Sequence, residues 1–149
     1  RDWSVTGVQT CALPILTRRN VKSGRQITNE PELENILENS GFEIIDPGQL
    51  SFSRQVKLFN ESNVIVSPHG AALANIVFCN SGTKIIELFN HQNISLGSQS
   101  YPNISKVCDF NLTRLPAQST SADTDDYVER CDFTVDLDAF RSVLNEALS

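Results

Sequence analysis

The chain has 149 residues, 40% of them hydrophobic and 20% charged, which fits one ordinary globular domain. Its formal net charge of −6 argues against a general nucleic-acid or anionic-membrane surface, so no nucleic-acid partner is expected. No run of about 18 apolar residues is present, and no membrane-spanning helix is predicted.

Residues 1–15 differ in character from the rest of the chain. The chain contains no methionine, and Val5–Ile15 reads VTGVQTCALPI, which looks like the translation of a common sequencing-library adapter. We therefore interpret residues 1–15 as an artefact and expect the folded domain to comprise residues 16–149. The alternative is a genuine strand followed by a turn.

From Leu16 onward, short apolar runs alternate with segments whose apolar residues recur every three or four positions. In chain order we predict strand 16–18, helix 31–39, strand 42–45, helix 52–60, strand 64–66, helix 70–78, strand 84–89, helix 101–108, strand 111–115, loop 118–127, strand 133–135 and helix 137–148. Pro31 suits a first helical turn, Asn29 is placed to cap it, and Gly41 ends that helix.

Strands separated by helices of about ten residues predict βαβ units with right-handed crossovers. The expected fold is therefore α/β, a Rossmann-like doubly wound parallel sheet. Ligands of such sheets bind at the carboxyl ends of the strands. This rule directs attention to the loop after Leu16–Arg18, the loop after Val66, and the end of the strand 84–89.

The segment Ser67–Asn75 reads SPHGAALAN and leads from a buried strand into a helix of small residues. Free N–H groups in the first helical turn, from Gly70 and Ala71 onward, form an anion site. His69 could donate to a phosphate or sugar oxygen, and Asn75 could hold the loop or the ligand. The alternative is a tightly packed strand–helix corner in which His69 bonds a carbonyl.

Two further features carry charge. Arg18, Arg19, Lys22 and Arg25 lie close together in an otherwise acidic chain, and arginine at a strand end suits a diphosphate; a solvated basic loop is the alternative. Glu87 lies inside the apolar run KIIELF, where it could bind ribose or sugar hydroxyls. Pairing with Arg25 or Lys84 is equally consistent with its position.

Several other chemistries have no support in the sequence. It contains no GxGxxG, GxxxxGK[ST] or GxSxG motif, and its cysteines and histidines have no zinc spacing, so no metal site is predicted. Asp123–Asp126 reads as a solvated loop rather than a metal clamp. Pairing of Cys108 with Cys131 is left open. The four matches to the N-glycosylation pattern, at Asn60, Asn93, Asn103 and Asn111, matter only in a secretory eukaryotic setting.

The ordered blocks TRRN…GRQITNEPEL, GFEIIDPGQLSFSRQVKLF, NVIVSPHGAALANIVF and KIIEL together resemble glycosyltransferase family 61. The resemblance covers residues 16–90 well and residues 100–148 loosely. It implies the C-terminal, donor-binding domain of a two-domain GT-B enzyme that transfers a sugar with inversion. It also implies a nucleotide-sugar substrate, no cofactor and no essential metal.

The resemblance extends to individual positions. Donor-binding positions of the family match Arg18, Arg25, Asn29, Glu30, His69, Gly70, Ala71, Asn75 and Glu87. The expected roles are that Arg18, Arg25 and the helix N-terminus at Gly70 hold the diphosphate, with help from His69. Glu87 is expected to hold hydroxyl groups. His69 is the candidate catalytic residue, although the general base is expected in an N-terminal domain that this chain lacks.

The expected partners are therefore a nucleotide sugar, a glycan or glycoprotein acceptor, and the N-terminal domain of the same parent chain. By itself the fragment is expected to be inactive. Bacterial members, which include capsular-polysaccharide enzymes, imply polysaccharide biosynthesis in the cytoplasm or at the cytoplasmic face of the membrane. Eukaryotic xylosyl- and N-acetylglucosaminyltransferases imply the ER or Golgi lumen. The alternatives are a non-catalytic nucleotide- or glycan-binding module and an unrelated flavodoxin-like regulatory domain.

Overall fold

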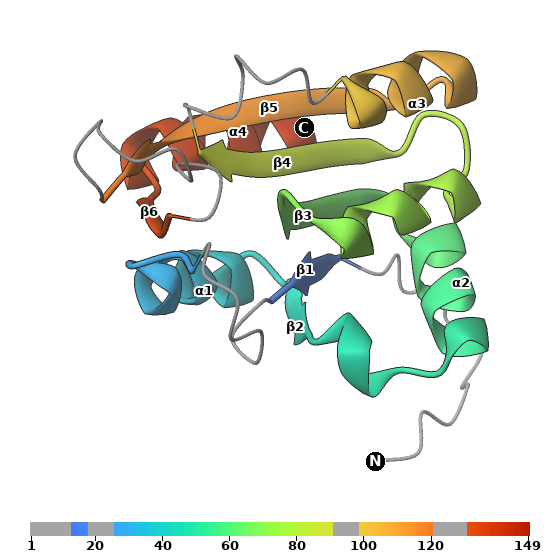
Figure 1. Cartoon of the computed structure of the whole chain (residues 1–149), viewed down its shortest axis with the longest axis horizontal. Helices are drawn as coiled ribbons and strands as arrows, with labels where there is room; N and C mark the ends of the chain where they lie inside the picture. Colours follow the sequence, from blue (N-terminus) through green and yellow to red (C-terminus); the bar gives the residue numbers. More distant parts are fainter. Residues whose placement is uncertain (1–12, 18–25, 91–98, 121–130) are drawn as a thin grey trace.

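The computed structural model describes residues 13–17, 26–90, 99–120 and 131–149, and a six-stranded sheet lies at its centre (Figure 1). The strands are β1 (Pro14–Leu16), β2 (Glu43–Ile45), β3 (Val64–Pro68), β4 (Lys84–Asn90), β5 (Asn111–Ser119) and β6 (Phe133–Thr134). Their order is β2-β1-β3-β4-β5-β6, with the first five parallel and β6 antiparallel to β5. The predicted Rossmann-like α/β class is confirmed, but the sheet is not wholly parallel.

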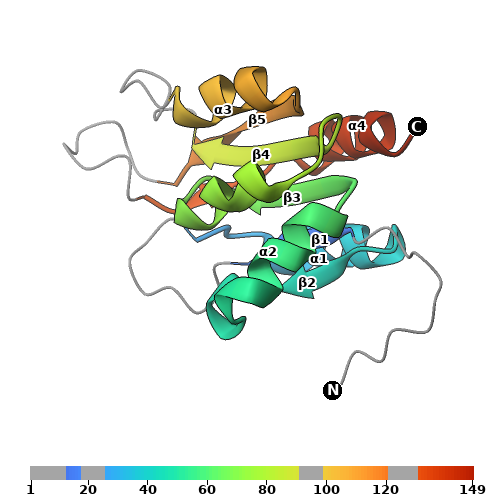
Figure 2. The ribbon, with the colours of Figure 1, turned by 90° about the vertical axis from the view of Figure 1, so that its right-hand side faces the viewer.

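Helices cover both faces of this sheet (Figure 2). The helices are α1 (Glu30–Asn39), 3-10 helix η1 (Pro47–Gln49), α2 (Phe52–Glu61), 3-10 helix η2 (Ala71–Phe78), α3 (Ser100–Cys108) and α4 (Leu137–Leu148). Buried residues of α1 and α4 cluster on one face, and those of α2, η2 and α3 cluster on the other. The chain therefore winds along the sheet in both directions from β1, as in a doubly wound fold.

The two hydrophobic clusters follow from the alternation of side chains along each strand. On β4, Ile86 and Leu88 face α1 and α4, whereas Ile85 faces η2 and α3. Both faces of the central strands are therefore buried, which explains why they read as continuous apolar runs. The largest fully buried side chains on the helices are Leu33, Leu37, Phe59, Leu73, Ile76 and Phe140.

The connection between β3 and β4 was predicted as an ordinary helix over 70–78, but η2 is a 3-10 helix. Leu73 and Ile76 are both fully buried, and they are three residues apart. In a 3-10 helix, which has three residues per turn, that spacing places both side chains on one side. Both side chains therefore pack into the hydrophobic cluster on that face of the sheet.

Strand boundaries differ from the prediction at both ends of the sheet. The first strand is β1, Pro14–Leu16, rather than the predicted 16–18, and its middle residue Ile15 is buried. The interpretation of residues 1–15 as an artefact stays a prediction. The strand predicted over 111–115 continues to Ser119, because Pro116 and Ala117 pair with β4, and Gln118 and Ser119 pair with β6. The remainder of the predicted loop from residue 121 lies outside the described residues. Within the described part of the chain, no helix combines the length and hydropathy needed to cross a bilayer.

Replacement of Phe140 by Ala is expected to lower the free energy of unfolding by about 3–5 kcal/mol, because this α4 side chain is completely buried. Phe52→Ala is the matched control. Phe52 is 67% exposed and makes one edge contact with Phe78, so its loss is expected to cost about 1.5 kcal/mol or less. Urea unfolding measures both, and equal losses would contradict the packing of α4.

Candidate functional site

Strand register brings three charged or polar side chains together near the carboxyl ends of β3, β4 and β5. Ser67, Glu87 and Arg114 are direct neighbours across these three strands and so share the η2 and α3 face. His69 follows Ser67 by two residues, and its backbone N–H donates to the Leu88 carbonyl at 2.7 Å. The polypeptide thus delivers His69, Glu87 and Arg114 to one place.

Glu87 is fully buried, and both of its carboxylate oxygens have partners. Oε1 lies 2.5 Å from Nδ1 of His69, and Oε2 accepts a hydrogen bond from Nε of Arg114 at 2.7 Å. An unpaired buried carboxylate would cost several kcal/mol, and the permanently charged guanidinium offsets this cost. Because a carboxylate carries no hydrogen, the proton in the His69 contact belongs to Nδ1.

Arg114 is fixed at two points. Nε bonds Glu87, and the guanidinium carbon lies 4.4 Å from the centre of the Phe89 ring in a cation–π contact. Its Nη2 atom is buried and finds no hydrogen-bond partner among the described residues. A buried unpaired donor costs about 1–3 kcal/mol. Arg114 therefore completes the hydrogen bonding of Glu87, while one of its own guanidinium nitrogens has no partner among the described residues.

Tyr101 of α3 braces the turn that carries His69. Its hydroxyl donates to the Gly70 carbonyl at 2.6 Å, and its ring meets the His69 ring edge-on with centroids 5.2 Å apart. Ala71, the first residue of η2, is exposed. The first turn of a 3-10 helix has N–H groups without intrahelical acceptors. This turn consequently combines N–H donors with an imidazole, an arrangement that can bind an anion.

The other predicted site residues lie apart from this cluster or outside the description. Arg18 and Arg25 lie outside the described residues. The Asn75 amide donates to Oε1 of Gln55 at 2.7 Å, which links η2 to α2. Glu30 accepts a 2.8 Å bond from the Thr17 hydroxyl, which follows β1.

Asn29 was predicted to cap α1, and this is wrong, because its side chain makes no cap bond. It instead donates to the Val135 carbonyl at 2.8 Å and accepts from the Val135 N–H at 3.0 Å. Both groups of this amide thereby join the chain before α1 to the chain after β6. A donor-binding role for Asn29 stays a prediction.

Sequence reasoning missed Arg114 and Tyr101. Of the two ion-pair partners suggested for Glu87, Lys84 is wrong, because residues three apart on β4 point to opposite faces. Arg114 takes that place from the neighbouring strand. The available signal was an arginine among the apolar residues of a predicted strand, next in the chain to a strand that contains a glutamate.

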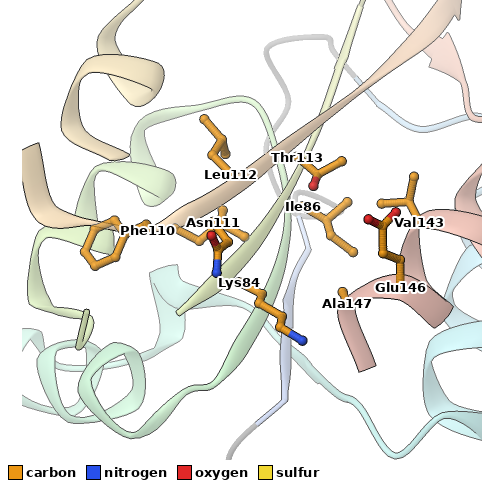
Figure 3. Close-up of a pocket in the computed structure, with 10 residues that line it drawn as sticks. Lys84, Ile86, Phe110, Asn111, Leu112, Thr113, Val143, Glu146 and Ala147 are labelled. Carbon is orange, nitrogen blue, oxygen red and sulfur yellow. The ribbon is translucent and has the colours of Figure 1, made fainter. Parts of the chain in front are cut away.

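Two surface hollows among the described residues lie at the opposite end of the sheet. The larger, about 520 Å³, is lined by the amino ends of β4 and β5 and by α4 (Figure 3). Its polar side chains are those of Lys84, Asn111, Thr113 and Glu146. The second, about 450 Å³, also lies at the amino ends of strands. Because ligands of doubly wound sheets bind at the carboxyl ends, we favour the His69–Glu87–Arg114 cluster over either hollow.

The described residues also bear on metal binding and on thiol chemistry. The described residues include no group of three His, Cys, Asp or Glu side chains placed to hold a metal, and Asp123–Asp126 lie outside them. Cys79 and Cys108 are free thiols. Burial, reinforced by the nearby Cys108, raises the pKa of Cys79 to about 12. Cys79 is therefore protonated at neutral pH and is a poor nucleophile.

Asn29→Ala is expected to lower the free energy of unfolding by about 1–3 kcal/mol, because it leaves the Val135 N–H and carbonyl without their partner. Asn39→Ala is the control, since Asn39 is exposed and bonds only Asn35 of its own helix among the contacts described. Urea unfolding compares the two. A loss for Asn29→Ala no larger than for the control would contradict this bridge.

Comparison with known proteins agrees with the resemblance seen in the sequence. No curated protein matches the chain. The family Glycosyltransferase 61 matches residues 9–86, which is more than half of the chain and includes β1, β2, β3 and the His69 turn. Glu87, Tyr101 and Arg114 follow the matched residues, so their inclusion in the site rests on the geometry above. The chain belongs to glycosyltransferase family 61.

Proposed function

We propose that this domain binds the nucleotide-sugar donor of a glycosyltransferase at the carboxyl ends of β3, β4 and β5. The observation that supports the proposal most is the cluster of His69, Glu87 and Arg114 beside the first turn of η2. Here the His69 imidazole and the N–H groups of the η2 turn are hydrogen-bond donors that can bind an anion. Family membership adds that the reaction is a sugar transfer.

In the proposed reaction, an acceptor hydroxyl oxygen attacks the anomeric carbon of the donor. A new glycosidic bond forms while the bond to the diphosphate breaks, and the electron pair of that bond goes to the departing diphosphate. The proton of the acceptor hydroxyl goes to a general base, which we place in the N-terminal domain of the parent enzyme. Attack from the side opposite the leaving group inverts the anomeric centre. No essential metal or cofactor is part of this proposal.

The donor domain would then stabilise the leaving group. N–H groups at Gly70 and Ala71, together with the His69 imidazole, would contact diphosphate oxygens, where donors in fixed positions lower the free energy of the developing charge. Arg18 and Arg25 are proposed to contribute positive charge to the same diphosphate.

The acceptor would be a glycan or a glycoprotein. The proposed locations are the bacterial cytoplasm, including the face of the membrane, or the ER or Golgi lumen.

A thermal-shift titration of the chain with UDP, GDP, CMP and NAD tests donor binding. At a concentration about 100 times the Kd, a ligand adds about 2.7 kcal/mol of stability. This corresponds to a rise in Tm of roughly 5–10 °C for a domain of this size. We expect such a rise with one nucleoside diphosphate and none with NAD. His69→Ala should reduce the rise by about half, since a tenfold loss of affinity removes about 1.4 kcal/mol.

Arg141→Ala serves as the control, because Arg141 is exposed on α4 and away from the site. It should retain the full rise in Tm. A cooperatively unfolding sample that responds to no nucleotide would overturn the proposed donor site. A response that His69→Ala leaves intact would move the binding site away from the η2 turn.

A further inference from the structure

We propose that Glu87 and Arg114 are positioning residues that fix the proton and the orientation of the His69 ring. The inference rests on the proposed function for what His69 contacts. It goes beyond that function because it assigns Arg114, which lies outside the family match, a role in the site. It also changes the expected role of Glu87 from binding hydroxyls directly to acting through His69.

Burial and exposure support this division of roles between Glu87 and His69. The side chain of Glu87 has no exposed surface, whereas that of His69 is 19% exposed. Glu87 uses one carboxylate oxygen for His69 and the other for Arg114. Glu87 therefore has no surface with which to contact a ligand directly, and its effect on a ligand is exerted through the hydrogen-bonded His69 ring.

The charge of Arg114 decides which ring nitrogen of His69 carries the proton. A guanidinium is always charged, so the Glu87 carboxyl beside it is held as a carboxylate, which only accepts hydrogen bonds. Nδ1 of His69 must then be the donor. In the neutral ring this leaves Nε2 as the acceptor nitrogen, and Nε2 is the nitrogen able to accept a proton. In functional histidines, a hydrogen bond from one ring nitrogen to a neighbouring carboxylate or carbonyl commonly sets the tautomer in this way.

The surroundings of Arg114 fit a positioning role. Phe89 covers one side of the guanidinium, and Nε is committed to Glu87. Yet Nη2 is buried with no hydrogen-bond partner among the described residues. An arginine that served packing alone would be expected to pair its buried nitrogens. Unpaired buried groups of this kind are typical of sites where another requirement takes precedence.

The test is long-range ¹H–¹⁵N correlation of the imidazole rings in the full chain at about pH 8, where an ordinary histidine is neutral. The sequence contains only His69 and His91, so a His91→Gln variant assigns the two rings. We expect the wild-type His69 ring to carry its proton on Nδ1. In Arg114→Met the buried Glu87 carboxyl should become neutral and donate to Nδ1, so the His69 proton moves to Nε2.

Arg114→Lys, which restores the positive charge, is expected to return the proton to Nδ1, and Arg141→Met is the matched control with no change. An unchanged His69 tautomer in folded Arg114→Met would overturn the inference. Should that variant fail to fold, Arg114→Gln, which keeps a donor without the charge, gives the same comparison, and a tautomer unchanged there also overturns it.

Nucleotide affinity in the same variants separates this inference from the proposed function. Arg114→Met should bind the nucleoside diphosphate up to about 10-fold more weakly, and no more weakly than His69→Ala, because Arg114 acts through the ligand-contacting imidazole. The double variant His69→Ala/Arg114→Met should bind no more weakly than His69→Ala. A wild-type chain that binds no nucleotide overturns the proposed function alone, whereas fully additive losses overturn the positioning role alone.

Discussion

A carboxylate with no exposed surface can exist in a protein only where other groups replace the water that it has lost. Glu87 meets this condition through His69 on one oxygen and Arg114 on the other. The three side chains come from the end of β3, from β4 and from β5, so this charge links three parallel strands. Tyr101 extends the network by bracing the Gly70 turn from α3. The geometry of the candidate site depends on this one buried charge.

The rest of the domain places those groups. Alternation along β4 directs Ile86 and Leu88 into one hydrophobic cluster and Ile85 into the other, with Glu87 on the second face near the end of the strand. The three-residue period of η2 buries Leu73 and Ile76 while it leaves Ala71 exposed beside His69. The connection between β3 and β4 thus contributes side chains to the hydrophobic core and also forms part of the candidate site. Helices on both sheet faces make the carboxyl ends of the strands the natural place for a ligand.

Local patterns in the sequence predicted the elements and the fold class, because apolar periodicity and turn residues act over short distances. The His69 turn and the strand position of Glu87 were predicted for the same reason. Arg114 was not, since its role depends on which strands are neighbours and on their register. The Asn29 amide bonds a residue 106 positions away, and only the folded chain shows that contact in place of a helix cap. The antiparallel direction of β6 likewise depends on pairing with β5.

The most direct test of where the donor binds is a map of backbone amide chemical shifts in ¹⁵N-labelled chain as a nucleoside diphosphate is added. A donor site at the carboxyl ends of the strands predicts the largest changes at His69, Gly70 and Ala71, with further changes along the end of β4. Changes centred on Lys84, Asn111 and Glu146 would instead place the ligand in the hollow at the amino ends. That result would contradict the assignment of the His69–Glu87–Arg114 cluster as the donor site.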